Sequence, residues 1–210
     1  MIRLHFYISL KEDREYILKS FPLMLKLFKK KTFSNWLNEY YSDFQSSNYL
    51  KFLSFWEENK QKILTELKKS SKTIIKEWRR KEKGFFEKVE EEFGPWKRKK
   101  YFCHLSSTYI CGGGYEYPTV IIFPFSKHVY PIETIQHELL HLHIVEDMKR
   151  LKLKPKNYFK FSEIAVAFAS KRIGIKPKFP NEETERYFEK IKRRKIEDWE
   201  EFLCFLSQII

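Results

Sequence analysis

Apolar side chains recur every three or four residues through most of the segment from residue 11 to about residue 92. This spacing follows the turn of an α-helix and therefore predicts helices that each bury one face. Residues 33–41 are expected to form one of these helices, with Ser34 as a candidate cap. The apolar positions that carry the pattern elsewhere are Leu18, Phe21, Leu25, Phe28, Leu50, Leu53, Trp56, Ile63, Leu67, Ile74 and Trp78.

The pattern changes after residue 100 to short apolar runs that are separated by turn-forming residues. Residues 101–105 and 107–111 are predicted strands, and the three glycines at 112–114 are expected to form the turn that follows them. Residues 117–123 are almost continuously apolar, which is typical of a strand that is buried on both faces. Helical spacing returns after Pro131.

Glycine and proline separate the helical pattern from the strands, which predicts a domain boundary between Gly84 and Trp96. We expect a helical domain over residues 1–84 and a domain of strands and helices over residues 85–210. With 210 residues, the chain is long enough for one large domain or two small ones. The predicted fold class is α+β, with a small mixed or antiparallel sheet and an N-terminal all-helical region.

The segment that begins at Pro131 contains the run His137-Glu138-Leu139-Leu140-His141. Residues four apart on a helix stand nearly one above the other, so both imidazoles project from one face and can bind one metal ion. Glu138 lies beside them, where a carboxylate can take a proton from a metal-bound water. Pro131 suits the first turn of such a helix, and the basic run 148–150 suits its end. A structural helix with hydrogen-bonded histidines is the alternative.

This run resembles the active-site helix of the zincin metallopeptidases. Metzincins continue the motif with a glycine and another histidine at fixed positions, which residues 142–147 do not provide. His143 lies about 160° around the helix from His141, so it is not expected to share the metal. The chain instead resembles the gluzincins, whose third ligand is a glutamate on a second helix, and especially their minimal soluble members. The resemblance covers roughly residues 101–171.

The resemblance implies that Glu163 is the third metal ligand. Glu163 is a lone carboxylate in the apolar, alanine-rich segment 161–169, which is expected to be helical, after a loop over residues 152–160. A buried carboxylate without a partner is unfavourable, and a dication beside it removes that penalty. Glu146 is the competing candidate, but it lies five residues beyond His141 and points away from the histidine pair.

Gluzincins also use groups outside the motif. Many carry an aspartate four residues after the ligand glutamate, which orients one histidine, whereas this chain has Ala167 there. The orienting group is then expected to be Glu133 or a backbone carbonyl. A donor for the transition-state oxyanion is also implied, and Tyr158 is our candidate because it lies between the two ligand helices. The alternatives for this donor are His128, Arg172 and Tyr187.

In zincins an edge strand holds the substrate backbone by strand addition. Residues 109–114 are our candidate for this edge, with an ordinary hairpin as the alternative. The resemblance thus implies a peptide or protein substrate that binds in extended form.

The chain carries 41 Lys and Arg against 28 Asp and Glu, which gives a net charge of +13. Most of this excess lies in residues 1–83. Residues 78–81 and 96–100 place cations directly after a tryptophan, which favours weak nucleic-acid contact through the basic N-terminal half. The alternative roles for this half are a pro-segment, a lid over the active-site cleft, or a structural layer of helices with a solvated basic face.

No stretch of the sequence has the eighteen or so apolar residues that a transmembrane helix needs. The N-terminus lacks the apolar core of a signal peptide, and the 3 cysteines show no paired spacing, so a cytoplasmic location is expected. Richness in Lys and Glu is typical of proteins from hyperthermophiles.

These observations predict a zinc-dependent metallopeptidase that hydrolyses peptide bonds. His137, His141 and Glu163 are the expected metal ligands, Glu138 is the expected general base, and Tyr158 the expected oxyanion donor. Action as an endopeptidase or as an aminopeptidase stays open. The alternatives are a latent or inactive zinc-binding protein of the same fold, and a basic helical nucleic-acid-binding protein in which the motif occurs by chance.

Overall fold

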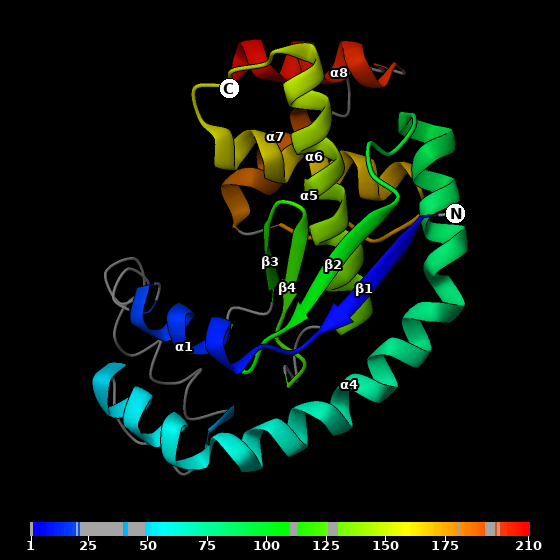
Figure 1. The fold of residues 1–210 in the computed structure, drawn as a ribbon. Coiled ribbons are helices and arrows are strands. Elements are labelled where there is room, and N and C mark those ends of the chain that lie inside the picture. Colours follow the sequence, from blue (N-terminus) through cyan, green and yellow to red (C-terminus); the bar gives the residue numbers. More distant parts are fainter. Residues whose placement is uncertain are drawn as a thin grey trace. The chain divides into compact units, whose positions relative to one another are not determined.

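The computed structural model describes residues 2–19, 21, 40–41, 49–109, 113–125, 130–179, 181–191, 196 and 198–210. Within these residues the chain forms six helices and a four-stranded sheet, which confirms the α+β class (Figure 1). The helix predicted to begin at residue 33 lies almost entirely outside the described residues. The elements are β1 (Arg3–Tyr7), α1 (Leu10–Lys19), α4 (Tyr49–Phe93), β2 (Lys100–Leu105), β3 (Gly113–Glu116), β4 (Thr119–Ile122), α5 (Pro131–Leu151), α6 (Tyr158–Arg172), α7 (Glu182–Ile191) and α8 (Trp199–Ile209).

The chain divides into two compact units, each assembled from separated segments. Unit 1 contains residues 1–3, 81–100 and 136–210, and unit 2 contains residues 4–80 and 101–135. Helices α4 and α5 each supply residues to both units. These units differ from the expected division after residue 84, because the first helices share a unit with the strands. Of the described residues, no helix is long and apolar enough to cross a bilayer.

The sheet is mixed and has the strand order β1-β2-β4-β3. β2 and β4 pair in parallel, with Cys103 opposite Val120, whereas β3 and β4 form an antiparallel hairpin. In Figure 1 the arrows of β1 and β2 lie side by side and point the same way. The prediction of an all-helical N-terminal region is therefore wrong at β1. Leu4 is the one side chain in β1 that is fully buried, so the strand is too short to show a period of two in the sequence.

The predicted strand at residues 101–105 is confirmed as β2, but residues 107–109 are not a strand, and residues 110–112 lie outside the described part. Gly113 and Gly114, predicted as a turn, are the first half of the edge strand β3. A side chain at position 114 would overlap the ring of Tyr109, so the glycine allows that ring to lie against the strand.

The prediction that residues 117–123 form a strand buried on both faces is wrong in its burial. β4 buries Val120 and Ile122, whereas Thr119 and Ile121 are half-buried. The apolar run of β4 is explained by one face of the strand that is fully buried and another that is partly buried. Pattern alone does not distinguish that arrangement from full burial.

α4 runs without a break through Gly84, where the sequence predicts an interruption. A single glycine inside a helix destabilises it by only about 1 kcal/mol, which a long helix tolerates. The helix ends at Phe93 because Gly94 adopts a left-handed φ of 94° and donates its N–H to the carbonyl of Glu90 at 3.0 Å. The next residue, Pro95, has no N–H with which to continue the ladder.

Unit 2 is held together by an aromatic core and a buried carboxylate. Asp13 on α1 is fully buried, and its two oxygens accept hydrogen bonds from the Ser106 hydroxyl at 2.6 Å and from the Ser107 N–H at 2.9 Å. The Ser107 hydroxyl also donates to Asp13 and in turn accepts from Trp56 Nε1 at 3.0 Å. These bonds fix α1 and α4 to the segment that follows β2. The core residues are Ile17, Phe21, Tyr41, Phe52, Trp56, Ile63 and Phe123.

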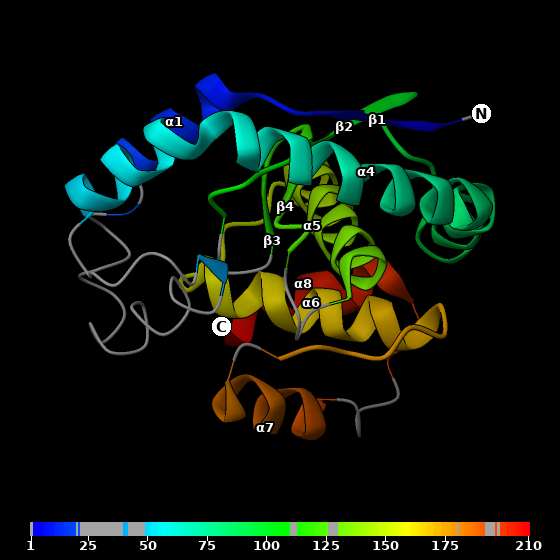
Figure 2. The ribbon, with the colours of Figure 1, turned by 90° about the horizontal axis from the view of Figure 1, so that it is seen from below.

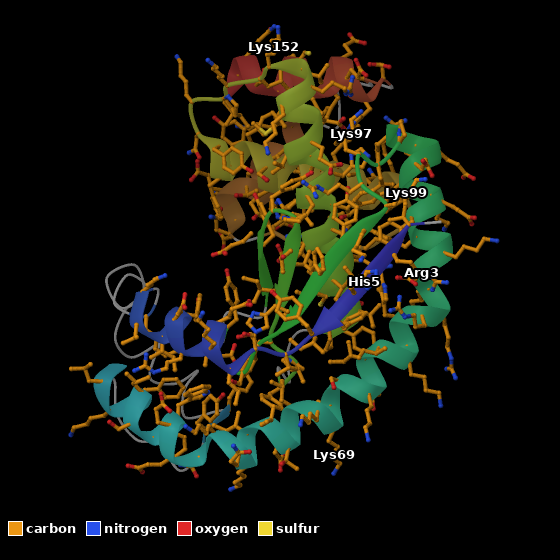
Figure 3. All side chains as sticks on the ribbon, in the orientation of Figure 1. Arg3, His5, Lys69, Lys97, Lys99 and Lys152 are labelled. Atoms are coloured by element: carbon orange, nitrogen blue, oxygen red, sulfur yellow. The ribbon has the colours of Figure 1, made fainter. Side chains whose placement is uncertain are left out.

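The two tryptophans of the basic clusters are buried. Trp78 has no exposed surface, and Trp96 donates Nε1 to the carbonyl oxygen of Phe86 at 3.3 Å. Neither ring is accessible for stacking on a base, so only the cations of these clusters remain as a surface feature. Figure 3 labels two exposed cations of the second cluster, Lys97 and Lys99. Nucleic-acid contact stays a prediction that rests on charge alone.

Asp13→Ala is expected to lower the free energy of unfolding by about 2–4 kcal/mol, because it leaves buried hydroxyl and N–H donors without their acceptor. Denaturant unfolding followed by circular dichroism measures this. The matched variant is Glu15→Ala on the same helix, where the carboxylate pairs with Lys19 at the exposed surface. That variant is expected to lose less than about 1 kcal/mol. Equal losses in the two variants would contradict an anchoring role for Asp13.

Candidate metal centre

α5 presents the His-Glu-His run within unit 1. The helix begins at Pro131 and ends at Leu151, as its sequence predicts. Lys152 then adopts a left-handed φ of 55°, and Leu153 donates its N–H back to the carbonyl of Met148 at 3.0 Å, which closes the helix. Within this frame His137 and His141 are one turn apart on a helix that is buried along most of its length.

α6 supplies the third candidate ligand. Its N-cap is Asn157, whose side chain accepts the N–H of Lys160 at 3.0 Å. The helix therefore begins at Tyr158, and the loop predicted over residues 152–160 is shorter than expected. Most of the helix is buried, including Ala165, Ala167 and Ala169.

The structure brings His137, His141 and Glu163 together. Their candidate ligand atoms all lie within 4.8 Å of one another. The two Nε2 atoms are 3.1 Å apart, and the Glu163 carboxylate oxygens lie 3.4 Å from His141 Nε2 and 3.7 Å from His137 Nε2. The side chain of His141 is 3% exposed, against 15% for His137 and 13% for Glu163, so the cluster is covered on one side and reaches solvent on the other.

These separations fit one tetrahedral cation. Metal–ligand bonds of about 2.0–2.2 Å in a tetrahedron hold the ligand atoms about 3.3–3.5 Å from each other. The two imidazole nitrogens are 3.1 Å apart, and each lies 3.4–3.7 Å from a different oxygen of the Glu163 carboxylate, so small side-chain adjustments would bring one oxygen into this range. Two imidazole nitrogens and one carboxylate are also the donor set of catalytic zinc sites, which leave a fourth position for water or substrate. The exposed side of the cluster gives that position access to solvent.

Ser162 orients His141. Its hydroxyl oxygen lies 2.6 Å from His141 Nδ1, and both side chains are buried. A proton on Nδ1 that is donated to this hydroxyl leaves the Nε2 lone pair directed at the cluster, which is the tautomer that a metal requires. The sequence prediction of Glu133 or a backbone carbonyl for this role is wrong for His141, since Ser162 contacts Nδ1 and Glu133 is exposed. Nothing in the spacing of a serine next to a glutamate signals this contact.

Burial sets the protonation states of the cluster. It lowers the pKa of His137 to about 3, with the charges of His141 and Lys178 adding to the effect, so this imidazole is neutral at ordinary pH. Burial also raises the pKa of Glu138 to about 7; the charge of Glu163 adds to this rise, and those of His141 and Lys178 oppose it. A carboxylate with a pKa near neutrality can both accept and return a proton.

Lys178 is a residue that the sequence does not predict at this site. Its positive charge acts on both His137 and Glu138, although it belongs to the segment after α6 and its side chain is half-buried. No spacing relates it to the motif, because its approach depends on how the chain turns after α6.

His143 has the structural role that its position on the helix predicts. Its Nε2 lies 3.2 Å from the carbonyl oxygen of Gly94, and its Nδ1 lies 3.2 Å from the carboxylate of Asp147. Burial opposes ionisation of Asp147, but His143 together with bonds from Trp199 and Arg150 holds its pKa below the ordinary value. This group ties the end of α4 and the start of α8 to α5.

Glu146, the competing ligand candidate, is buried and accepts the N–H of Lys97 at 3.2 Å. It therefore caps a backbone donor and is not a member of the histidine cluster.

Tyr158 is the first residue of α6 and is 44% exposed. It lines a hollow of about 380 Å³ with Val145, Met148 and Lys152, beside the C-terminal part of α5. None of the three candidate ligands lines this hollow. The oxyanion role of Tyr158 stays a prediction that its position does not favour.

The alternatives for that role have other contacts. Arg172 pairs with Glu92 and lies over the ring of Phe168 at 5.7 Å. Tyr187 receives the Lys160 ammonium over its ring at 3.4 Å. His128 lies outside the described residues.

The C-terminal helix α8 packs within unit 1. Trp199 of α8 donates Nε1 to Asp147 at 2.8 Å, and Phe202 stacks on Phe168 of α6 with ring centres 3.9 Å apart.

Comparisons of this chain with models of protein families, with curated proteins and with solved structures gave no match. The geometry of the cluster is therefore the main indication of function.

Metal-free Glu138→Gln protein is expected to be more stable than metal-free wild type at pH 8, by about 3 kcal/mol. Folded wild type keeps a proton on Glu138 up to about pH 7, whereas the unfolded chain releases it near 4.5. The folded state thus binds more protons between these values, and its stability falls as the pH rises through them.

Denaturant unfolding in the presence of a chelator, from pH 4.5 to 8, measures this difference. The advantage of the variant is expected to grow across that range and then level off. A difference that stays constant with pH would contradict the burial of an ionisable Glu138.

Proposed function

We propose that this protein is a zinc-dependent peptidase of the zincin type, with His137, His141 and Glu163 as the zinc ligands and Glu138 as the general base. The observation that carries the proposal is the gathering of two imidazole nitrogens and one carboxylate, whose candidate ligand atoms all lie within 4.8 Å of one another. A His-Glu-His run by itself supports only two ligands. The third donor comes from a different helix at the distance that one ion requires.

The donor set supports zinc in particular. Imidazole nitrogen is a good ligand for zinc and for several other transition metals, whereas magnesium and calcium favour oxygen. Two nitrogens and one oxygen in a half-open cluster are typical of hydrolytic zinc sites. When bound there, zinc supplies a Lewis acid that polarises a carbonyl and lowers the pKa of water towards ~7.

The chain's own residues supply the rest of the chemistry. Glu138 is buried next to the ligand His137, so it is placed to take a proton from the attacking water and to return it to the leaving amine. Ser162 holds His141 in the tautomer that binds the metal. Hydrolysis of a peptide bond needs this combination of an electrophile and one proton carrier, and no further cofactor.

Purified protein is expected to hold about one zinc per chain. His137→Ala, His141→Ala and Glu163→Ala each remove one of three ligands and are expected to lose the ion on dialysis, which elemental analysis measures. His5→Ala is the matched control, because His5 is exposed on β1. Ser162→Ala is expected to keep the ion with roughly tenfold weaker affinity, since it removes the orienting hydroxyl. Equal zinc contents in wild type and the three ligand variants would rule out this centre.

Zinc-loaded Glu138→Gln is expected to retain its metal and to cleave casein or a quenched peptide library at least about 100-fold more slowly than wild type, because glutamine cannot accept the proton. Glu185→Gln on α7 makes the same chemical change at an exposed position and is expected to cleave at the wild-type rate. Wild-type turnover by the Glu138→Gln protein would overturn the assignment of the base. A wild type that holds zinc but cleaves none of the substrates would favour a latent zinc-binding protein.

A further inference from the structure

Cations cover the outer side of α4 between residues 62 and 80. At about 100° per helical residue, eight residues of this stretch fall within one arc of about 120°. Seven of these eight are Lys or Arg, and the eighth is Thr65. Lys and Arg make up 41 of the 210 residues, about one in five, so composition alone does not explain the arc. Arg79 donates to the carbonyl oxygen of Leu4 at 3.0 Å, and we call the other six cations the basic stripe: Lys62, Lys68, Lys69, Lys72, Lys76 and Arg80.

The basic stripe faces solvent. All six of its side chains are exposed, whereas Ile63 and Leu67 are buried on the opposite side of the helix. Figure 3 shows Lys69 projecting from α4 on the side away from the sheet. In Figure 2, α1 lies beside the first turns of α4, where Arg14 Nε is 2.7 Å from a carboxylate oxygen of Glu57. The stripe begins beyond that contact, so α1 leaves it accessible.

The positive charges of the stripe are not balanced by the described part of the chain. None of the six cations forms an ion pair with a described residue. Other cations of the same helix do: Lys60 lies 3.2 Å from Glu57, and Lys83 lies 3.7 Å from Glu87. The helix therefore pairs its cations on both sides of the stripe but not within it.

The arrangement within the stripe is unfavourable for the isolated helix. Four of its members follow one another at four-residue spacing from Lys68 to Arg80, and like charges at this spacing destabilise a helix. The two carboxylates between residues 62 and 80, Glu66 and Glu77, lie about 40° and 60° beyond one edge of the arc. Glu77 accepts a hydrogen bond from Tyr130. A partner with a row of negative charges would remove this repulsion.

The dimensions of the stripe fit the phosphates of a nucleic-acid duplex. From residue 62 to residue 80 the helix is about 27 Å long. Phosphates follow one another about every 3.4 Å of axis along each strand of DNA, so several lie within reach of this length. The major groove of B-DNA is about 12 Å wide and admits an α-helix, whereas that of duplex RNA is too narrow. Cations at both edges of the arc can then reach the phosphates on both sides of the groove.

Other polyanions fit this surface less well. Single-stranded nucleic acid is held by aromatic rings on which bases stack, and the ring of Trp78 is fully buried. Peripheral helices on an anionic bilayer insert apolar side chains, and the arc of α4 has none. The arc also has no amide or carboxylate side chain of the kind that pairs with adenine or cytosine. The side chains of the stripe are therefore suited to phosphates and not to the reading of a base sequence.

We propose that the outer side of α4 binds double-stranded DNA through its phosphate backbone, without sequence preference. The basic stripe lies in unit 2, whereas the three candidate metal ligands lie in unit 1. The inference thus goes beyond the proposed peptidase and does not depend on it.

The test is fluorescence anisotropy of the full chain with a labelled duplex of about 20 base pairs, in 50–200 mM NaCl. Six phosphate contacts are expected to give a slope of about −5 for the logarithm of the binding constant against that of the salt concentration. The triple variant Lys69→Gln, Lys72→Gln, Lys76→Gln is expected to make the slope shallower by about three and to bind at least about tenfold more weakly at 100 mM NaCl.

The matched control is the triple variant Lys154→Gln, Lys156→Gln, Lys176→Gln, which removes the same charge from exposed positions of unit 1. It is expected to bind DNA within about twofold of wild type. Both triple variants are expected to keep the circular dichroism of wild type, and the stripe variant to unfold at no lower temperature, because it has less repulsion between like charges. An equal loss of affinity in the two variants would overturn the inference, since net charge alone would then explain binding.

Three further results would also overturn it. The first is the absence of binding to the duplex at 50 mM NaCl. The second is tighter binding to a single strand, or to a duplex RNA, of the same length. The third is binding to vesicles of phosphatidylserine and phosphatidylcholine that the stripe variant loses while its affinity for DNA stays at the wild-type value.

Discussion

The close contact between α5 and α6 determines whether this protein has a metal centre at all. Two histidines on α5 can meet a glutamate on α6 only where the two helices approach, and their Nε2 atoms lie 3.4 and 3.7 Å from the oxygens of Glu163. The same contact brings the Ser162 hydroxyl to within 2.6 Å of His141. Ligand geometry and ligand tautomer thus depend on one packing arrangement.

The electrostatics of the centre follow from its burial. Burial favours the neutral forms of Glu138 and His137, because it raises the pKa of the carboxyl and lowers that of the imidazole. Neutral imidazole is the form that binds a metal, so burial of His137 favours binding. The carboxylate of Glu163, by contrast, gains most from a cation beside it. The site is therefore a place where a positive ion improves the local electrostatic balance.

Sequence reasoning was most successful where local periodicity carries the information. The helix from Pro131 to Leu151 and the placement of His137 and His141 on one of its faces follow from spacing alone. The resemblance to gluzincins, together with a lone charge among apolar residues, pointed to Glu163, which the structure places beside them. Sequence reasoning failed where tertiary pairing determines the secondary structure. β1 and β3 are strands because neighbouring strands pair with them, and the glycines of β3 gave the opposite signal. Ser162 and Lys178 reach the centre through helix packing and a chain reversal, and neither leaves a trace in residue spacing.

The interleaving of the two units has a consequence for biosynthesis. Unit 1 combines residues 1–3 and 81–100 with everything from residue 136 onwards, and unit 2 closes around strands that are made after most of its helices. β1 is synthesised before β2, with which it pairs, and Glu163 is synthesised after both histidines of α5. The three residues of the candidate centre can therefore come together only after translation has passed Glu163.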